Sequence, residues 1–542
     1  MKNHSHEIKF IEDVANTASK NILRKLSKYT KNELALKSDE KKILQRESNL
    51  FKKKFRDTLI YSLKLSQEAL EGNRKSAKRV WYFNQEMKAK RKIIDGVFPH
   101  AARAWILDGL IIKKQYAGIK YLVGLNDLDG AVLDVLNSAS SINLGAENPW
   151  LLMMDRIEDF MGWKDNVCNA YHPGLRQSFA FEILKNLYPV KKSRKNLYIH
   201  MESSASIVDS IAIETVNAYA EKVLKLDNAR VLAVDGTWAG GFGSAREATG
   251  FGVDNQQIRR MGKATWVDRS LPAPTKDYRN EFIKKLSEKI AKKQVSGLYL
   301  EPDILGDLGL IKTDIKLLLE VKKLMKKSRL PIILDCVQQL GRTGSYWGEN
   351  VDKIFSDFDL LVLTTAKSAS NGQPFGMVML PSTIEKEAYP FTQITTNQMN
   401  GPLLRVLLVA ELLRDYRLQN WFEQKSNAIE KIANQEKFPI KNLFGKFLNR
   451  GVFVATNDNA KLVQIALLVE DGVLVGALPS AIRYQPMLLE LSETNENVAR
   501  IIFRRVKQVL KGNVSKEVKK IYNLMSGVSS GLARENKGRL KN

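Results

Sequence analysis

An acid and a lysine each follow a short apolar run in the second half of the chain. Asp335 ends the run that begins at Leu330, and Lys367 lies just beyond the run 359–363. Such runs are typical of buried strands in an open α/β sheet, and these sheets bind ligands beyond the carboxyl ends of their strands. An amine and a carboxylate in these positions suit pyridoxal phosphate. The amine can form a Schiff base with its aldehyde, and the carboxylate can keep the pyridine nitrogen protonated.

This pair by itself does not define a site. An aspartate at a strand end is more often a cap or turn residue, and a single lysine is usually a solvated charge. The neighbouring segments decide between these interpretations.

Three more predicted strands end in loops that could contribute to a site. The strand 196–201 precedes Ser203-Ser204-Ala205 and a helix to about Leu224, and the start of such a helix can bind an anion. The strand 230–234 precedes Trp238, which could cover a flat ring or belong to the core. The strand 297–300 precedes a loop that contains Asp307.

Strands and helices alternate over residues 190–380, which predicts a mainly parallel sheet with helices on both faces. A helix is predicted at 311–327. After Pro381 the pattern becomes more helical, with an apolar helix at 403–418. Residues 440–510 predict a small α/β domain with strands at 462–468 and 473–475 and a final helix at 495–510.

The composition fits a protein of several domains. With 542 residues, of which 44% are hydrophobic, the chain can bury a large core. Cys168 and Cys336 are too few for a disulfide scaffold and fit a reducing compartment. No apolar run approaches the roughly 20 residues that cross a bilayer, and the N-terminus lacks the pattern of a signal or transit peptide. We therefore expect a cytoplasmic protein with no membrane partner.

The formal net charge of +26 makes an acidic partner worth considering. Residues 1–95 repeat apolar positions at helical spacing among many cations, which predicts a basic, helical N-terminal extension. The segment 73–92 combines Trp81, Tyr82 and Phe83 with lysines and arginines, and it could hold phosphates and stack on nucleic-acid bases. Packing of these aromatic rings on the next domain is the simpler interpretation, and we favour it.

Segments between residues 115 and 510 resemble, in the same order, the motifs of the class III (ω-amino) aminotransferases, which are pyridoxal-phosphate enzymes of fold type I. The matching segments are 126–134 with 143–145, Ser203-Ser204-Ala205, 235–240, 301–309, 335–344, Lys367 and its loop, Thr395 or Thr396 before Asn400-Gly401-Pro402, and 482–486. Each segment is degenerate, but their common order argues against coincidence.

The resemblance implies roles around the cofactor ring. Lys367 would form the Schiff base and then move protons as general base and acid. Asp335 would pair with the pyridine nitrogen, and Gln338 would bind the phenolic oxygen. Trp238 stands where the family has an aromatic residue and would stack on the ring.

The resemblance also implies how the phosphate and the substrate are bound. The N–H groups of Ser203-Ser204-Ala205 would hold the phosphate, with Thr395 or Thr396 contributed by a neighbouring subunit. Arg483 would pair with a substrate carboxylate. Asp307 stands where many members have the glutamate that holds this arginine.

Several positions depart from the family pattern. Ser204 replaces the glycine of the phosphate loop, and Ser206 replaces the acid that follows it. Ala239 stands at a usual histidine position, and Cys336 replaces the glutamate after the ring-pairing acid. These changes affect the surroundings of the substrate, whereas the residues assigned to the cofactor are intact.

We therefore predict an α/β protein of fold type I in five segments: a basic helical extension (1–95), the first part of a small domain (96–180), a large pyridoxal-phosphate-binding domain (181–400), a connecting helix with the C-terminal small domain (401–510) and a basic mobile tail (511–542). The five histidines have no metal-ligand spacing, so we predict no metal.

The predicted function is transfer of an amino group from a primary or ω-amine to a 2-oxo acid, by a homodimer as the resemblance implies. One alternative is another pyridoxal-phosphate reaction, such as that of an aminomutase or a decarboxylase. A second alternative is a diverged, aminotransferase-like protein that binds nucleic acid or an acidic partner through its N-terminal extension.

Overall fold

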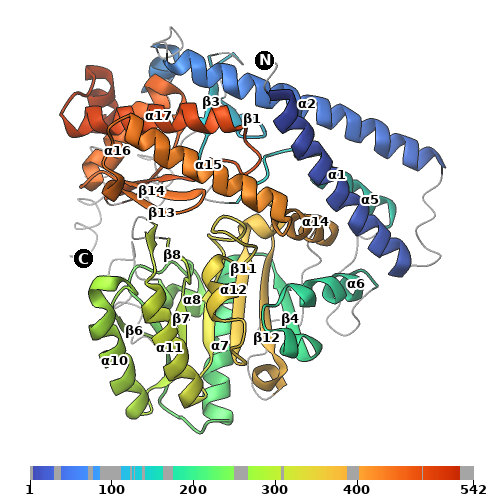
Figure 1. The fold of residues 1–542 in the computed structure, drawn as a ribbon, viewed down its shortest axis with the longest axis vertical. Helices are drawn as coiled ribbons and strands as arrows, with labels where there is room; N and C mark the ends of the chain where they lie inside the picture. The colour runs from blue at the N-terminus through green and yellow to red at the C-terminus, as the bar shows by residue number, and fades with distance from the viewer. Residues whose placement is uncertain are drawn as a thin grey trace, which may run out of the picture.

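The protein has two lobes (Figure 1). The computed structural model describes residues 4–29, 38–70, 77–82, 84–85, 112–122, 125–126, 129–136, 141–162, 175–249, 266–306, 310–386, 402–478 and 480–524. The lower lobe in Figure 1 is built on a large sheet, and the upper lobe contains the C-terminal elements and the first two helices.

The lower lobe holds a seven-stranded sheet with the order β4-β12-β11-β10-β7-β5-β6. Adjacent strands are parallel except at β12, which is antiparallel to both of its neighbours. In sheet order the strands are Leu197–Glu202, Gly376–Pro381, Leu361–Ala366, Ile332–Asp335, Val295–Leu300, Arg230–Val234 and Val267–Leu271. The prediction of a mainly parallel central sheet is therefore confirmed.

Helices cover both faces of this sheet. Ile333 of β10 packs in a core cluster with α7 (Ala205–Lys222). Its neighbour Ile332 belongs to the cluster that contains α10 (Arg279–Ala291) and α11 (Ile315–Ser328). Alternate residues of a strand point to opposite faces, so a strand covered on both sides must be apolar throughout. This explains the continuous apolar runs in the sequence.

The C-terminal elements form a smaller α/β unit in the upper lobe, as predicted. Its antiparallel sheet has the order β13-β14-β17-β16, and three helices lie beside it (Figure 1). The strands are Leu443–Lys446, Asn449–Phe453, Ala481–Tyr484 and Gly476–Ala477, and the helices α15, α16 and α17 are Tyr416–Gln435, Asn457–Ala466 and Ser492–Leu510.

The prediction of a strand at 462–468 is wrong. This segment lies in α16 and in the π-helical turn Leu467–Asp471 that follows it. The side chain of Thr456 caps α16 by accepting a hydrogen bond from the N–H of Asn459 at 3.1 Å. A short apolar run has the same composition in a buried strand and in a buried helix, and the capping threonine was the signal that separates them.

Two predicted helices have other bounds in the structure. The segment 403–418 contains the whole of one helix, α14 (Leu403–Leu413), and the start of α15, because Asp415 is extended and caps α15. The helix predicted at 311–327 begins only at Ile315, after the short strand β9 (Ile311–Lys312).

A third sheet joins distant parts of the chain. Its strands β1 (Ile112–Tyr116), β2 (Ile119–Leu122) and β3 (Ala131–Asp134) are antiparallel neighbours, and β3 pairs in parallel with β15 (Val473–Leu474). The antiparallel pairing of β2 with β3 forms a hairpin around Asn126. The strands near residue 120 therefore belong to the same lobe as the C-terminal unit.

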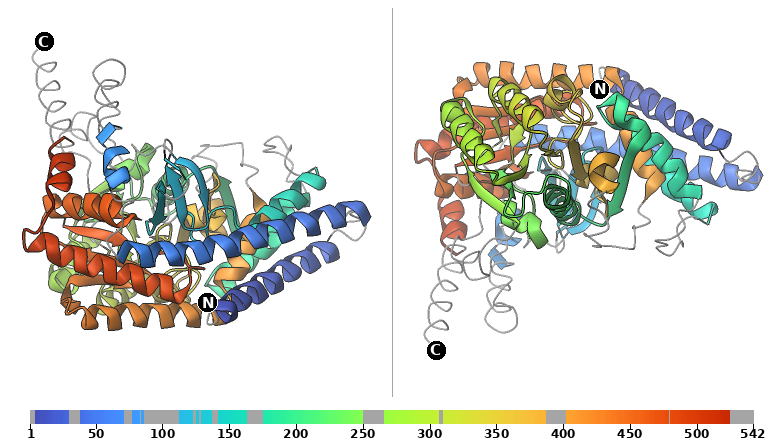
Figure 2. Two further views of the ribbon diagram at one scale, coloured as in Figure 1. Left: turned by 90° about the horizontal axis from the view of Figure 1, so that it is seen from above. Right: turned by 90° about the horizontal axis from the view of Figure 1, so that it is seen from below.

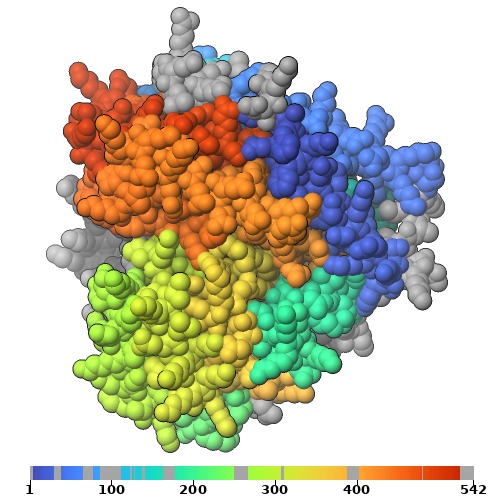
Figure 3. Space-filling model, in the orientation of Figure 1, coloured from blue at the N-terminus to red at the C-terminus, as the bar shows by residue number. Residues whose placement is uncertain are grey.

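The first two helices are part of the core. They are α1 (His4–Tyr29) and α2 (Ser38–Leu70), and α1 packs against α14 and α5 (Pro149–Phe160). Figure 2 shows both helices along one side of the upper lobe, and in Figure 3 the atoms of α1 lie directly against that lobe. Buried residues of α1, among them Ile22, belong to the main core cluster. The helical extension is thus confirmed, but it is not a detached arm.

Substitution of Ile22 by alanine should therefore destabilise the whole protein. Ile22 is 0% exposed, and removing a buried isoleucine side chain costs about 2–5 kcal/mol. Urea unfolding would measure the change, with Lys20→Ala on the exposed face of the same helix as the control. Equal stability of the two variants would show that α1 does not contribute to the core.

The aromatic segment near residue 80 is partly buried. Tyr82 is 6% exposed and packs in a small apolar cluster, whereas Trp81 is 61% exposed. Phe83 lies outside the described residues. Val518 and Ile521 belong to the same cluster as Tyr82, so the first part of the predicted mobile tail is packed.

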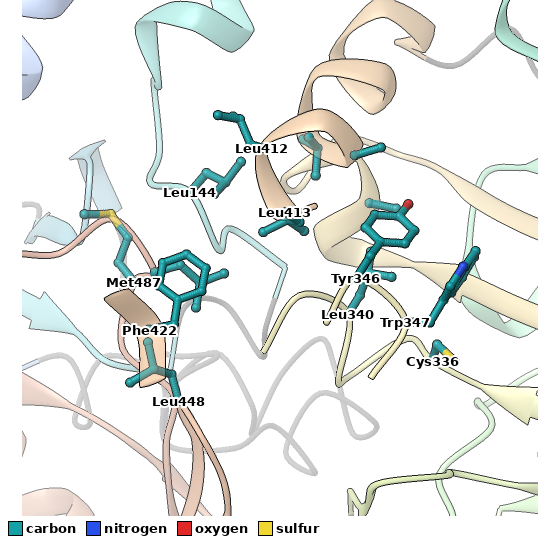
Figure 4. Packing of buried hydrophobic residues seen from close by; sticks show 14 of the residues in the cluster. Leu144, Cys336, Leu340, Tyr346, Trp347, Leu412, Leu413, Phe422, Leu448 and Met487 are labelled. Atoms are coloured by element: carbon teal, nitrogen blue, oxygen red, sulfur yellow. The ribbon is translucent and has the colours of Figure 1, made fainter. Parts of the chain in front are cut away.

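Apolar side chains fix the segment that follows β10. Figure 4 shows the side chains of Cys336, Leu340, Tyr346 and Trp347 in one buried cluster with Leu412 and Leu413 of α14. A β-carbon on Gly341 would lie 2.6 Å from Leu413 Cδ1, so this contact leaves no room for a side chain. The end of β10 is therefore held in a rigid environment.

Across the described residues, no helix has both the length and the apolar character that crossing a bilayer requires. The same part of the chain contains no group of three or more His, Cys, Asp or Glu side chains arranged to hold a metal ion.

Candidate active site

Asp335 and Lys367 lie at the ends of neighbouring parallel strands. Asp335 is the last residue of β10, and Lys367 follows directly after β11. The register of the two strands places Asp335 opposite Thr364. Both side chains line one cavity of about 390 Å³. The structure thus brings together the two residues on which the sequence prediction rests.

The other predicted site residues are distributed around this cavity. Four of them line it: Ser203, Ser204, Ala205 and Trp238. Gln338 and Arg483 are buried beyond its lining. Thr395, Thr396 and Asp307 lie outside the described residues, so the roles predicted for them stay predictions.

The backbone of Lys367 is left-handed, with a φ of +48°. This conformation is unfavourable for residues other than glycine, so its surroundings must hold it. The carbonyl oxygen of Lys367 accepts a hydrogen bond from the N–H of Gly372 at 3.2 Å. The Asn371 side chain accepts one from the N–H of Leu144 at 2.8 Å and donates one to the carbonyl of Gly145 at 3.0 Å. The lysine therefore stands on a short loop tied to a distant segment.

Burial controls the charge of Asp335, which is 2% exposed. Its Oδ1 accepts a hydrogen bond from the N–H of Val337, and its Oδ2 accepts one from the hydroxyl of Tyr299, each at 2.8 Å. Desolvation raises the pKa of Asp335 to about 6, and these hydrogen bonds and the charge of Lys367 oppose the shift. A cation placed against this carboxyl would favour its ionised form.

The loop after β4 leads into the N-terminus of α7. Ser204 is extended and makes no side-chain hydrogen bond that caps the helix, and Ser204, Ala205 and Ser206 line the cavity. The N–H groups and the dipole at such a helix start attract anions. Packing around the loop is tight: a β-carbon on Gly376 would lie 2.5 Å from the carbonyl oxygen of Ser204, and one on Gly240 would lie 2.2 Å from Ser206 Oγ.

Gln338 and Arg483 meet at Gly306. A β-carbon on Gly306 would lie 2.5 Å from Gln338 Nε2, and Nη2 of Arg483 donates a hydrogen bond to the Gly306 carbonyl oxygen at 2.8 Å. Among the described residues, Gln338 Oε1 has no hydrogen-bond partner although the side chain is 4% exposed. These two residues converge although they are far apart in the sequence, Gln338 after β10 and Arg483 in β17.

Two side chains of the site were not predicted from the sequence. Asp209 of α7 lines the cavity, and Tyr299 of β7 binds Asp335. Asp209 lies one helical turn after Ala205, so an acid on an apolar helix just behind the loop was an available signal. Nothing in the sequence distinguishes Tyr299 from an ordinary core residue of a strand.

These residues fit pyridoxal phosphate. The cavity offers an amine at Lys367, a carboxyl at Asp335, an anion-binding helix start after Ser204 and a flat ring at Trp238. The backbone of Ser204 packs closely against Gly376, and polar atoms of Gln338 and Asp209 are buried without a hydrogen-bond partner among the described residues. Both features are typical of a preorganised ligand site.

A methyl group added at Gly376 should weaken cofactor binding. The new β-carbon would push the phosphate loop through the Ser204 carbonyl, and overpacking of this kind costs about 1–3 kcal/mol, or roughly 5- to 150-fold in affinity. Titration of the apoprotein with pyridoxal phosphate would measure it for Gly376→Ala. The control is Gly241→Ala in the facing loop, where a β-carbon meets nothing within 4 Å. An unchanged affinity of Gly376→Ala would show that the loop at Ser204 does not bind the cofactor.

The chain belongs to the aminotransferase class-III family, whose family model matches residues 121–506. The resemblance drawn from the motifs is thereby confirmed. Pyridoxal phosphate, the cofactor predicted from Lys367 and Asp335, is the cofactor of this family.

Individual relatives are distant. The chain is 26% identical over 220 residues to a probable mitochondrial acetylornithine aminotransferase of Schizosaccharomyces pombe, which is 39% of this chain and 48% of that protein. It is 24% identical over 393 residues to an acetylornithine aminotransferase of Bacillus anthracis, which is 71% of this chain and 91% of that protein. The match thus spans about half the length of the yeast protein and most of the bacterial one.

The fold is similar to that of solved transaminases. The PMP-bound form of an aminotransferase from Vibrio fluvialis superimposes with a TM-score of 0.63 at 14% sequence identity, covering 75% of this chain and 94% of the other. This likeness confirms the predicted fold of type I.

Proposed function

We propose that this protein is a pyridoxal-phosphate-dependent aminotransferase that moves an amino group from a primary or ω-amine to a 2-oxo acid. The observation that carries the proposal is the cavity in which Lys367 and Asp335 meet at the ends of adjacent strands. Family membership and the preorganised loop after β4 support it.

The residues of the cavity have different roles in the proposed reaction. Bound pyridoxal phosphate supplies an aldehyde that takes up an amine and a ring that withdraws electrons from the carbon losing its proton. Lys367 Nζ would hold the aldehyde in the resting enzyme and, once released from it, would accept and donate a proton at the substrate. Asp335 holds the proton on the ring nitrogen, and Trp238 covers one face of the ring and keeps water away from it.

The same cavity anchors and orients the ring. The start of α7 at Ser204-Ala205 would hold the phosphate through backbone N–H groups, and Gln338, which is buried beyond the cavity lining, would orient the phenolic oxygen. An aminomutase or a decarboxylase would use these groups too. Transfer of the amino group to a 2-oxo acid is the step that distinguishes an aminotransferase from them.

A decisive experiment compares the half-reactions of the purified protein. After loading with pyridoxal phosphate, an ω-amine such as N-acetylornithine or ornithine should shift the visible spectrum, and a 2-oxo acid should restore it with one amino acid formed per enzyme site. Acetylornithine follows from the names of the relatives, and ornithine follows from the name of a protein of similar solved structure, an ornithine aminotransferase of Toxoplasma gondii. Loss of carbon dioxide, or no spectral change with any amine, would contradict the proposal.

Arg483 is proposed to bind the substrate carboxylate. The residue is 9% exposed, and its guanidinium already donates to the carbonyl of Gly306, so the side chain is held in a fixed direction. Replacing it by glutamine should raise KM for the 2-oxo acid about 10- to 150-fold, the value of a charged hydrogen bond, and leave the cofactor spectrum unchanged. An unchanged KM would mean that Arg483 only supports the Gly306 loop.

We further propose that the enzyme is a cytoplasmic homodimer. The role predicted for Thr395 or Thr396, phosphate binding from a neighbouring subunit, requires two chains. Light scattering of the purified protein would report the assembly, and cell fractionation would report the compartment. A monomer with full activity would contradict the proposal that a neighbouring subunit contributes Thr395 or Thr396.

A further inference from the structure

A second buried carboxyl lies in the cavity with Asp335 and Lys367. Asp209 of α7 is 1% exposed, and among the described residues neither of its oxygens has a hydrogen bond of acceptable geometry. An ionised carboxylate at this depth without donors is unfavourable by several kcal/mol. Burial and the nearby Asp335 raise the pKa of Asp209 well above its usual value.

Tyr299 connects the two acids. Its hydroxyl donates to Oδ2 of Asp335 at 2.8 Å, which leaves the lone pairs of the phenol oxygen to accept a hydrogen bond. The hydroxyls of Tyr299 and Thr364 both lie close enough to Asp209 to oppose part of its pKa shift. Tyr299 belongs to β7 and Thr364 to β11, the strands on either side of β10.

The charges around Asp209 favour its neutral form. The ionisable groups that face it are Asp335 at the end of β10, Tyr299 in β7 and Lys367 after β11. Glu301, at the end of β7, acts on Tyr299 as well. Two buried carboxylates would repel each other, and one ammonium group can balance only one of them.

We propose that Asp209 is a neutral acid that donates its proton to the phenol oxygen of Tyr299 and thereby positions Tyr299 as the donor to Asp335. Hydrogen bonds in such a chain strengthen one another, so Asp209 sets the strength with which Asp335 holds a cation. Asp209 is thus a positioning residue for the ring nitrogen. The inference rests on the proposed function, since it takes Asp335 as the partner of that nitrogen.

The test compares an amide with a truncation at this position. Asp209→Asn keeps a neutral donor of the same shape, so its affinity for pyridoxal phosphate should stay within about threefold of the wild type, whereas Asp209→Ala should lose about tenfold or more. Quenching of tryptophan fluorescence on cofactor binding measures both. The matched control is Glu214→Gln on the same helix, whose carboxylate accepts a hydrogen bond from Ser244 outside the cavity and whose pKa burial also raises.

A second readout needs no cofactor. A neutral buried acid ionises on unfolding, so the wild-type apoprotein should lose stability as the pH rises from about 4 toward the raised pKa of Asp209. Asp209→Asn removes this loss. The melting temperature of the variant relative to the wild type should therefore rise as the pH increases above about 4, the usual pKa of an aspartate.

Coupling to Tyr299 completes the test, and the stability readout of Asp209→Asn remains available if Asp209→Ala does not fold. Tyr299→Phe should weaken cofactor binding, and adding Asp209→Ala to it should cause no further loss, because the link is already broken. The proposal is overturned if Asp209→Asn loses affinity as Asp209→Ala does, if the pH dependence of stability is the same as in the wild type, or if the two losses add. A wild type that binds no pyridoxal phosphate would instead refute the proposed function, and the stability readout would still decide the charge of Asp209.

Discussion

Replacement of Lys367 by alanine is expected to abolish turnover and the visible absorbance band of bound pyridoxal phosphate. In the proposed function the lysine holds the aldehyde and moves the proton, and loss of a general base alone costs about 10²- to 10⁴-fold in rate. The loop that carries Lys367 is tied by Asn371 to Leu144 and Gly145, so truncation of the side chain should leave the fold intact. Absorbance spectroscopy and a coupled assay for the amino acid formed from the 2-oxo acid measure the two effects.

Lys367→Arg is the matched control for this experiment. Arginine keeps a positive charge near Asp335 but stays protonated and cannot replace the amine as base. It should therefore retain a folded cavity and lose activity like alanine. Turnover of Lys367→Ala near the wild-type rate would place the chemistry elsewhere in the molecule.

Asp335→Asn should have the second largest effect. It keeps the shape of the side chain but removes the charge that faces the ring nitrogen, and loss of one partner from a buried charge pair costs about 2–5 kcal/mol. Turnover should fall by about 10²- to 10³-fold, and the affinity for pyridoxal phosphate should fall with it. Steady-state kinetics at saturating cofactor separate the two losses.

The pH dependence supplies the control for Asp335. Its pKa is raised to about 6, so in the apoprotein the carboxyl becomes neutral as the pH falls through that value. Cofactor affinity should therefore decrease on the acid side of about pH 6 in the wild type. Asp335→Asn should lack this decrease, because it has no carboxyl to protonate. An acid limb that persists in the variant would assign the titration to another group.

The sequence by itself determined the outline of the fold and the central pair of the site. Strands covered on both faces are continuous apolar runs, and β7, β10 and β11 were recognisable for that reason. Asp335 and Lys367 could then be assigned to strand ends, because parallel strands in such a sheet expose their carboxyl ends at one edge. The order of the motifs in the sequence also indicated the family and predicted that Ser203-Ser204-Ala205 binds the phosphate.

The local sequence pattern could not predict the secondary structure where a strand and a helix would have the same composition. The run 462–468 suits a strand or a helix equally, and its capping residue Thr456 decided for the helix. The basic N-terminal region predicted a helical extension. The side of α1 that contains Ile22 is instead buried against elements hundreds of residues away, and sequence periodicity does not say what covers an apolar face.

Only the tertiary structure decided which polar groups gather around Asp335 and its cavity. Asp209, Tyr299 and Asp335 come from a helix and two strands that are far apart in the chain, and the order of strands in the sheet brings them together. The same holds for the meeting of Gln338 and Arg483 at Gly306. The physical reason is that propensity and capping act over a few residues, whereas burial, and with it the charge of a carboxyl, depends on which distant segments pack around it.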